Sequence, residues 1–457
     1  IPPPDAAPAA LSVRHVKAVA ARAMSVATGA PSGVVHINLP FRPPLEPTEV
    51  KGDVLITPAD ALGQPDQAYV SMITSGPGPA GAELVESLAA LITQHPKGAI
   101  VGGVDWTCDD TLAEAIETLS QASGYPIFSD ALSGLRSGPA RSLGAFETYF
   151  SGKHPLPSPE VVVRIGNVPT SKWLNDWLDK ARPKHVIHLS QDGVWADDQY
   201  RVSHFVHADR RATALALAAK LGQYPPPSSA WREQFERAER IAWQCFAQAT
   251  AGVPPSGEWF DAVVAHDVAA LLPDGATLFA GNSLPVRHID QFAQPNPKRL
   301  RIIANRGASG IDGNVSTALG LAHADPSRPL ALLIGDVTMY HDMNGLLAVR
   351  RCGVPITIVL LNNNGGGIFR RLPIKDFEPE FTQHFITPHD LDFAQVAKLY
   401  SLEYANPSTR AEFQAMFTQS VNQRKAMLIE VKTDSRQDLR LRQAIVNEVL
   451  RQCYING

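Results

Sequence analysis

The sequence has few cysteines and no long hydrophobic run, and each shortage excludes a class of protein. Its four cysteines, Cys108, Cys245, Cys352 and Cys453, are widely separated along the chain. That spacing builds neither a zinc knuckle nor a disulfide framework, and it favours a reducing, cytoplasmic compartment. The longest apolar runs, such as Pro355–Leu361, have the length of a strand, so no membrane span is expected.

Like charges do not gather into blocks anywhere in the chain. The 41 basic and 45 acidic residues are spread along its whole length, and the formal net charge is −4 at pH 7. Nucleic acids and anionic membrane surfaces are bound through basic patches, so neither is expected as a partner. The sequence also lacks an initial methionine and a signal-peptide pattern. It opens with Ile1-Pro2-Pro3-Pro4, which indicates a processed or truncated polypeptide.

The length and composition are those of a globular protein with more than one core. The 457 residues are 44% hydrophobic and 19% charged, which is enough for two or three domains. Proline removes a backbone donor and stiffens the chain, so clusters of proline indicate linkers. Three such clusters occur, at Arg42–Pro47, Tyr224–Ser229 and Val253–Gly257.

Between these clusters the pattern alternates between helix and strand. Near the start, Ser12 is expected to cap a helix, and a strand is expected to follow at Val34–Leu39. Another helix is predicted at Thr111–Leu119, and further strands at Ala99–Val101, Val161–Ile165, Thr277–Phe279, Leu330–Ile334 and Ile356–Leu361. The last three strands are near-continuous apolar runs, which suit strands buried on both faces of a parallel sheet. The predicted fold class is therefore α/β, with parallel-sheet domains, helices on both faces and ligand sites at the carboxyl ends of strands.

The most informative segment is a predicted β-α-β unit. The strand Leu330–Ile334 ends in Gly335-Asp336, and a helix is expected through His341–Arg351, closed by Gly353. A second strand then ends in Asn362-Asn363-Asn364-Gly365-Gly366-Gly367. Because such crossovers are right-handed and place the two strands parallel, Asp336 and Asn363 should lie at the same edge of one sheet.

The chemistry of this edge indicates a hard metal ion. The carboxylate of Asp336, the amide oxygen of Asn363 and the carbonyl of Gly365 form half of an all-oxygen octahedron. This set suits Mg²⁺, with Mn²⁺ as an alternative, and the ion usually completes its shell with phosphate and water. The run of glycines lets the backbone approach a diphosphate. The Gly-Asp pair alone, or the Asn/Gly run alone, is equally typical of an ordinary turn. Their combination in one β-α-β unit favours a cofactor site.

Gly335-Asp336 followed by Asn362-Asn363 at this spacing resembles the diphosphate-anchoring motif of thiamine-diphosphate enzymes. The resemblance implies that Asp336 and Asn363 bind Mg²⁺ through their side chains and Gly365 through its carbonyl, with Gly335 and Gly366 beside the cofactor. The usual motif has glycine after the aspartate, whereas this chain has Val337. That departure argues against the decarboxylase branch.

Three further stretches narrow the resemblance, and two in the middle of the chain agree with them. They are Gly281–Arg287, Asn305–Gly313 and Asn363–Phe369, together with Asp130–Arg136 and Thr170–Lys172. Over essentially the whole chain they are similar to the MenD family of 2-succinyl-5-enolpyruvyl-6-hydroxy-3-cyclohexene-1-carboxylate synthases. The resemblance implies decarboxylation of 2-oxoglutarate and addition of the succinyl-semialdehyde unit to isochorismate, in menaquinone or phylloquinone biosynthesis.

Both implied substrates are dianions, so fixed cations are expected in the pocket. By the resemblance, Arg287 and Arg306 bind carboxylates, with Asn282 and Ser283 beside them, since the guanidinium fork suits a carboxylate. Lys172 matches a substrate-facing lysine of the middle domain. The alternative for all three cations is an ordinary ion pair.

Apolar residues are expected to shape the cofactor and substrate. The resemblance makes Ile311 the bulky residue under the bent cofactor, and Ile368 and Phe369 the residues that line the substrate side. Core packing is the alternative for each of them. His341 and Asp342 are interpreted as the first turn of the helix after the metal loop, where an acidic residue suits the helix dipole.

The resemblance also predicts the domain organisation. Residues 1–47 correspond to the end of a pyrimidine-binding domain, 58–223 to a middle α/β domain, and 228–457 to the diphosphate and Mg²⁺ domain. The glutamate that activates the cofactor in such enzymes has no counterpart here. We therefore expect a homodimer or homotetramer, or a separate chain that supplies the pyrimidine domain, and we expect the chain alone to be inactive.

Two other functions fit the same residues. One is a carboligase of the acetolactate-synthase type, and the other is a non-catalytic module that keeps the cofactor fold. Several arginines in the pocket would favour the dianionic substrates of the synthase, and complete metal ligands argue against the module. The expected location is the cytoplasm, or a plastid if the source is a photosynthetic eukaryote.

Overall fold

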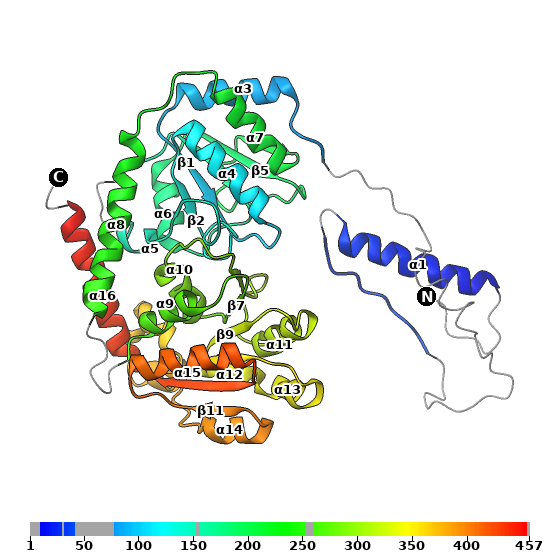
Figure 1. Ribbon diagram of the computed structural model, residues 1–457, viewed down its shortest axis with the longest axis vertical. Coiled ribbons are helices and arrows are strands. Elements are labelled where there is room, and N and C mark those ends of the chain that lie inside the picture. The colour runs from blue at the N-terminus through cyan, green and yellow to red at the C-terminus, as the bar shows by residue number, and fades with distance from the viewer. Residues whose placement is uncertain (1–9, 30–31, 42–76, 152–155, 252–258, 455–457) are drawn as a thin grey trace. The chain divides into compact units, whose positions relative to one another are not determined.

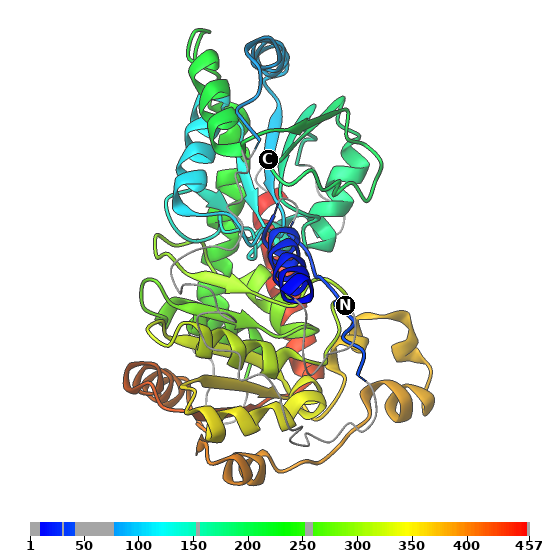
Figure 2. The same ribbon diagram turned by 90° about the vertical axis from the view of Figure 1, so that its right-hand side faces the viewer.

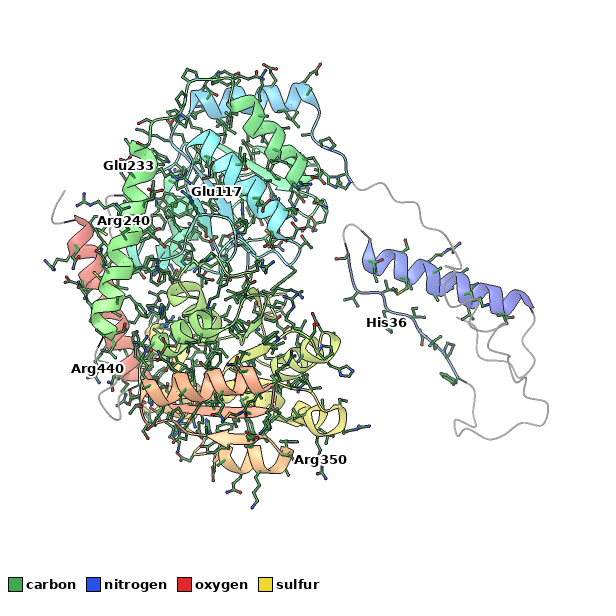
Figure 3. The ribbon with its side chains drawn as sticks, viewed as in Figure 1. His36, Glu117, Glu233, Arg240, Arg350 and Arg440 are labelled. Carbon is green, nitrogen blue, oxygen red and sulfur yellow. The ribbon has the colours of Figure 1, made fainter. Side chains whose placement is uncertain are left out.

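The computed structural model describes residues 10–29, 32–41, 77–151, 156–251 and 259–454. These residues form two compact units. The smaller unit contains helix α1 (Ala10–Thr28) and the extended segment that carries His36 (Figure 3). Ser12 lies inside α1, so the prediction that it caps the helix is wrong. The predicted strand Val34–Leu39 is also wrong, because the segment is extended but is not part of a strand in the described part of the chain.

The larger unit contains two six-stranded sheets, which lie one above the other in both views (Figures 1 and 2). The first sheet has the order β3-β2-β1-β4-β5-β6. Its strands are β1 (Gly98–Gly102), β2 (Ile127–Ser129), β3 (Ser142–Leu143), β4 (Val161–Ile165), β5 (His185–Ser190) and β6 (His204–His207). The pairings from β3 through β5 are parallel. The predicted strands of this region are confirmed.

The second sheet has the order β11-β12-β10-β9-β7-β8, and every neighbouring pair in it is parallel. Its strands are β7 (Thr277–Ala280), β8 (Arg301–Ile303), β9 (Leu330–Gly335), β10 (Thr357–Asn362), β11 (Glu403–Ala405) and β12 (Met427–Lys432). Successive side chains of its strands enter two different cores: Leu278 packs in one, Phe279 in the other. Burial on both faces explains why these strands are unbroken apolar runs.

Helices cover both faces of the second sheet, as predicted. One face packs against α9 (Asp261–Leu271), α10 (Leu284–Phe292) and α15 (Arg410–Gln423). The other packs against α11 (Asn314–Ala324), α12 (Asp336–Asp342), η1 (Met343–Leu346), α13 (Leu347–Cys352) and α14 (Phe393–Tyr400). Three short turns, η2 (Gly367–Arg371), η3 (Pro373–Asp376) and η4 (Thr382–Ile386), follow β10.

The remaining helices surround the first sheet and join it to the second. They are α3 (Ala82–Gln94), α4 (Asp110–Ser123), α5 (Phe146–Tyr149), α6 (Lys172–Ala181), α7 (Arg210–Leu221), α8 (Ala230–Thr250) and α16 (Ser435–Tyr454). Helices α8 and α16 run side by side along one flank (Figure 1), with polar side chains such as Glu233, Arg240 and Arg440 on their exposed sides (Figure 3). No helix in the described part of the chain is long and apolar enough to cross a membrane.

Of the three predicted linkers, the structure describes one. Tyr224–Ser229 does separate two helices, α7 and α8. Arg42–Pro47 and Val253–Gly257 lie outside the described residues.

The β-α-β unit has the predicted strands but a different helix. Strands β9 and β10 are parallel neighbours, with Leu361 opposite Gly335, so Asp336 and Asn363 follow adjacent strand ends. The helix predicted through His341–Arg351 is instead divided into α12, η1 and α13, and it begins at Asp336 itself. His341 and Asp342 therefore lie at the end of α12, not in its first turn. Gly353, with φ of 63°, closes α13 as predicted.

Candidate active site

Asp336 is the first residue of α12 and lies directly beneath the loop that follows β10. Its side chain is 2% exposed. The Oδ1 atom accepts a hydrogen bond from the amide of Val337 (2.7 Å), and Oδ2 accepts one from the amide of Gly365 (2.9 Å). Burial raises the pKa of this carboxyl, although both amides and a nearby histidine favour the charged form. A cation bound beside this carboxylate would stabilise its charged form.

Asn363 and Gly365 lie on the loop after β10, where sequence analysis placed the other two ion ligands. The Oδ1 atom of Asn363 is buried and has no hydrogen-bond partner among the described residues. Buried side-chain oxygens are nearly always paired, so this atom is available to a ligand. Together with the Asp336 carboxylate and the Gly365 carbonyl it gives a hard, all-oxygen donor set, which fits Mg²⁺.

The glycines of this loop are required by its close packing. Gly365 has φ of +142°, and a Cβ atom there would lie 2.1 Å from the carbonyl oxygen of Ile386. A Cβ at Gly366 would lie 2.2 Å from the carbonyl oxygen of Phe385. The amide of Gly366 also donates to the carbonyl of Ile386 (2.8 Å). Only glycine allows this approach, so the loop has a fixed path past the proposed ion.

Polar side chains outside the predicted motif hold the loop in place. Asn362 donates to Glu430 Oε1 on the neighbouring strand β12 (2.6 Å). Asn364 accepts hydrogen bonds from the amides of His389 (3.1 Å) and Asp390 (2.9 Å). His389 Nε2 lies 3.3 Å from Asp336 Oδ2, so a protonated imidazole would place a positive charge beside the carboxylate. Sequence analysis did not identify His389 or Glu430, because both belong to distant segments.

Ser283, the residue before α10, has an unusual backbone conformation. Its φ of 76° and ψ of −125° are rarely adopted by a residue with a side chain. Strain of this kind is concentrated at ligand sites, because it persists only where the surroundings enforce it. The conformation points the carbonyl of Ser283 at Arg287, which donates to it from Nη1 (2.6 Å).

Arg287 and Arg306 lie close enough for their charges to interact. Burial lowers the pKa of Arg287, and the positive charge of Arg306 lowers it further. Neither guanidinium forms an ion pair with a carboxylate in the described part of the chain. The alternative of an ordinary ion pair therefore does not hold for the described residues, and two cations remain available for anionic groups.

Asn282 contacts Arg306 and the loop that carries it. Its buried side chain donates to the carbonyls of Asn305 (2.7 Å) and Gly310 (2.6 Å), and it accepts from Arg306 Nη1 (3.0 Å). All three bonds tie it to the Asn305–Gly313 stretch. Asn282 therefore shapes that loop and orients Arg306, with no side-chain hydrogen atom left for a ligand. On the same loop, Ile311 is partly exposed, as a residue in contact with a ligand would be.

Ile368 and Phe369 lie in η2 and are also partly exposed. Phe369 packs edge-on against Phe385, with ring centroids 5.4 Å apart. They are therefore not fully enclosed core residues.

Lys172 is the first residue of α6. Its side chain is 71% exposed and pairs with Asp176 one turn later. The same ammonium lies over the ring of Trp173, 4.9 Å from its centroid. Its contacts are thus local.

Glu147, which sequence analysis missed, connects α6 to the second sheet's helices. It accepts hydrogen bonds from the hydroxyl of Ser171, the N-cap of α6, and from the amide of Trp173 (3.3 Å). The Oε1 atom of Glu147 lies 3.5 Å from Nη2 of Arg442, on α16. Arg442 donates to Gln291 of α10 (2.5 Å), one turn after Arg287. One carboxylate thus links the helices that carry Lys172 and Arg287, and no local sequence pattern signals it.

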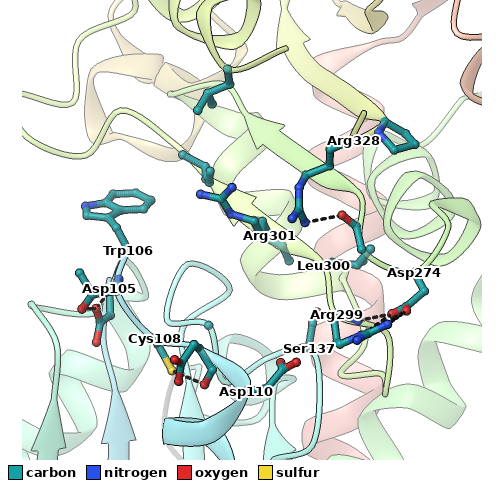
Figure 4. A pocket seen from close by; sticks show the side chains of 18 of the residues that line it. Asp105, Trp106, Cys108, Asp110, Ser137, Asp274, Arg299, Leu300, Arg301 and Arg328 are labelled. Carbon is teal, nitrogen blue, oxygen red and sulfur yellow. Dashed lines mark hydrogen bonds and ion pairs between the residues drawn. The ribbon is translucent and has the colours of Figure 1, made fainter. Parts of the chain in front are cut away.

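The cavity drawn in Figure 4 lies elsewhere, beside the edge strand β8. It measures about 900 Å³ and includes Trp106, Asp110, Arg301 and Arg328 in its lining. None of the predicted cofactor or substrate residues is among the described residues that line it. The candidate site is therefore identified by its chemistry rather than by the size of a cavity.

The region that contains the proposed ion ligands matches a known family model. Residues 287–431 match the family model described as "Thiamine pyrophosphate enzyme, C-terminal TPP binding domain". This range includes Asp336, Asn363 and Gly365.

Curated relatives match nearly the whole chain. The three described below are named 2-succinyl-5-enolpyruvyl-6-hydroxy-3-cyclohexene-1-carboxylate synthase. The protein from Roseiflexus castenholzii is 51% identical over 97% of this chain and 75% of its own length. The one from Roseiflexus sp. strain RS-1 is 50% identical over 97% of this chain and 75% of its own length. The one from Halobacterium salinarum is 39% identical over 98% and 76%, respectively. At this level of identity and coverage, the chain belongs to the family of 2-succinyl-5-enolpyruvyl-6-hydroxy-3-cyclohexene-1-carboxylate synthases.

Proposed function

We propose that this protein, with thiamine diphosphate and Mg²⁺, decarboxylates 2-oxoglutarate and adds the remaining four-carbon unit to isochorismate. The product is the cyclohexene carboxylate for which the relatives are named. The observation that carries the proposal is the juxtaposition at one sheet edge. Three oxygen ligands follow the adjacent strands β9 and β10, and two arginines without carboxylate partners among the described residues follow β7 and β8.

Asp336, Asn363 and the carbonyl of Gly365 would hold the ion, and the ion would hold the diphosphate. The buried, unpaired Asn363 Oδ1 and the raised pKa of Asp336 both support this use, since a bound cation would relieve both. When bound, thiamine diphosphate supplies the electron sink that lets a 2-oxo acid lose carbon dioxide. The chain's own contribution at this point is to fix the cofactor and its charge.

Arg287 and Arg306 would recognise the substrate carboxylates. A buried guanidinium is costly unless it is paired, and the cost is recovered when a carboxylate binds in bidentate fashion. Asn282 holds Arg306 in position. Ile311, Ile368 and Phe369 would form the apolar wall that excludes water from the reacting carbon. Lys172 is proposed as a weaker, more exposed contact.

The test is a steady-state assay with a pyrimidine-binding domain present, in the same or in a separate chain, and with 2-oxoglutarate, isochorismate, thiamine diphosphate and Mg²⁺. Arg287→Ala and Arg306→Ala should each lower kcat/KM for at least one substrate by about 10- to 100-fold, the worth of one charge-assisted hydrogen bond. Lys172→Ala should have a smaller effect, because an exposed lysine contact is less directional. Arg350→Ala, on the exposed side of α13 (Figure 3), is the matched control and should change nothing.

The alternatives predict different outcomes of the same assay. Pyruvate used in preference to 2-oxoglutarate would favour a carboligase of the acetolactate-synthase type. Tight binding of thiamine diphosphate and both substrates without any turnover would favour a non-catalytic module.

A further inference from the structure

Three buried side chains from three helices converge, and none of them is a proposed Mg²⁺ ligand. Asp261 is the first residue of α9, His288 lies in α10, and Asp438 lies in the first turn of α16. Their exposed fractions are 1%, 0% and 3%. One oxygen or nitrogen atom of each lies within 4.8 Å of the corresponding atoms of the other two.

The polar atoms of this cluster lack partners. Asp261 Oδ1, Asp438 Oδ1 and both ring nitrogens of His288 make no hydrogen bond to any described residue. His288 Nε2 lies 3.5 Å from Asp261 Oδ2, outside hydrogen-bonding geometry. A buried histidine normally pairs at least one nitrogen, and buried carboxylates are normally paired or bound to metal. The cluster is therefore incomplete as a set of protein groups alone.

The charges around the cluster leave room for a cation. Arg442 is already engaged by Glu147 and Gln291. Arg371 is the remaining guanidinium that acts on both carboxylates, and its Nη2 atom makes no hydrogen bond within the described residues. Among the described residues, Arg371 is thus the guanidinium that acts on both carboxylates, and Arg442 acts also on Asp438.

The protonation states suit metal binding. Burial raises the pKa of Asp261 and of Asp438 to about 6, so both are ionised at neutral pH. Burial lowers the pKa of His288 to about 3, which keeps the imidazole neutral. Neutral imidazole and ionised carboxylate are the forms that bind metal ions.

We propose that Asp261, His288 and Asp438 form a second metal site, for a divalent transition-metal ion such as Zn²⁺. One imidazole and two carboxylates suit Zn²⁺, Co²⁺ or Mn²⁺, whereas Mg²⁺ prefers oxygen ligands only. Ligand atoms around a four-coordinate zinc lie roughly 3.4 Å apart, given bonds of about 2.1 Å. His288 Nε2 and Asp261 Oδ2, 3.5 Å apart, are already close to that spacing.

The role of this site would be structural. The ion would join the starts of α9 and α16 to α10, and His288 is the residue next to Arg287. Fixing α10 at this point would hold the backbone that presents Arg287. The site itself does not depend on the proposed reaction, because its ligands are separate from those of the cofactor.

Metal content is the direct test. The full chain is loaded with Zn²⁺, dialysed against excess Mg²⁺ with a weak chelator, and assayed for zinc by mass spectrometry. Wild-type protein should retain about one zinc per chain, and Asp261→Asn and Asp438→Asn should retain at least 10-fold less. Two controls should keep the zinc: Asp336→Asn, which removes a proposed Mg²⁺ ligand, and His266→Gln, a neighbouring histidine of α9 bonded to the carbonyl of Phe292.

Wild-type protein that retains no zinc would overturn the proposal, as would unchanged zinc content in folded Asp261→Asn and Asp438→Asn variants. Should a variant fail to fold, cobalt in the wild-type protein decides. Co²⁺ at the proposed site should give the strong visible bands of four- or five-coordinate cobalt, and these should persist in Asp336→Asn. Only the weak bands of six-coordinate cobalt, lost in Asp336→Asn, would refute a second site and leave the cofactor site standing.

Discussion

Replacing Asp336 by asparagine should separate cofactor binding from stability. The carboxylate accepts hydrogen bonds from the amides of Val337 and Gly365, and asparagine keeps the shape but only one accepting oxygen. One amide therefore loses its partner, at a cost of about 1–3 kcal/mol if it stays buried. Removing the charge acts in the opposite direction, because burial raises the pKa of Asp336 and so disfavours its ionised form.

These two effects partly cancel in the cofactor-free protein. Its free energy of unfolding should fall by no more than about 2 kcal/mol. Cofactor binding should suffer more, because Asp336 is the only charged side chain among the proposed ion ligands. Losing one charge-assisted contact is worth about 1.5–3 kcal/mol, or about 10- to 150-fold in affinity.

Calorimetric titration of thiamine diphosphate in the presence of Mg²⁺ measures the predicted loss. Asp342→Asn is the matched control. That carboxylate is also buried on α12 and accepts two hydrogen bonds, both from Ser316 (2.7 and 2.8 Å), but it is not a proposed ligand. A folded Asp336→Asn protein with unchanged affinity would refute the reasoning, and so would an equal loss in Asp342→Asn.

Three further predictions follow from particular contacts. Gly365→Ala should lower cofactor affinity at least 10-fold, about 1.4 kcal/mol, because its Cβ would lie 2.1 Å from a backbone carbonyl oxygen. Gly353→Ala, also at positive φ but with open space around it, should leave the affinity unchanged. Glu147→Gln should lower kcat/KM for 2-oxoglutarate about 10-fold by loosening the helices of Lys172 and Arg287, whereas Glu160→Gln, at a partly exposed carboxylate, should not. The wild-type protein without metal should lose about 3 kcal/mol of unfolding free energy relative to Asp261→Asn as the pH rises from about 4 to about 6. The folded carboxyl has a pKa of about 6 against an ordinary 3.8, so the folded state holds a proton that the unfolded chain releases. Identical denaturation curves for the two proteins across this range would contradict that last expectation.

The sheet positions of the site could be predicted from the sequence. Continuous apolar runs require burial on both faces, and the β-α-β connection then dictates parallel neighbours. Together these constraints place Asp336 beside the Asn363 loop before any coordinates are known. Local pattern and general topology were sufficient there because few alternative arrangements satisfy them.

Element boundaries and long-range polar contacts could not be predicted in the same way. The helix after β9 begins at Asp336, directly after the last strand residue Gly335, which has no side chain to form a capping hydrogen bond. The segment Val34–Leu39 has the composition of a strand, but pairing decides strand formation and composition does not. Glu147 acts on helices far apart in the sequence, so no spacing in the sequence indicates its role.

Asn282 illustrates a residue placed correctly but assigned an incomplete role. The resemblance put it beside the substrate arginines, and it does contact Arg306. The sequence does not reveal that the Asn282 side chain also donates hydrogen bonds to the carbonyls of Asn305 and Gly310. Such use depends on the path of a loop in space.

The most direct test of the central claim is to locate the ion. Crystals grown with thiamine diphosphate and Mn²⁺ in place of Mg²⁺ would reveal each manganese by its anomalous scattering. The account predicts an ion about 2.1 Å from Asp336 Oδ, Asn363 Oδ1 and the carbonyl oxygen of Gly365, with diphosphate oxygens completing its shell. Cofactor bound with its ion away from these three oxygens would contradict the account.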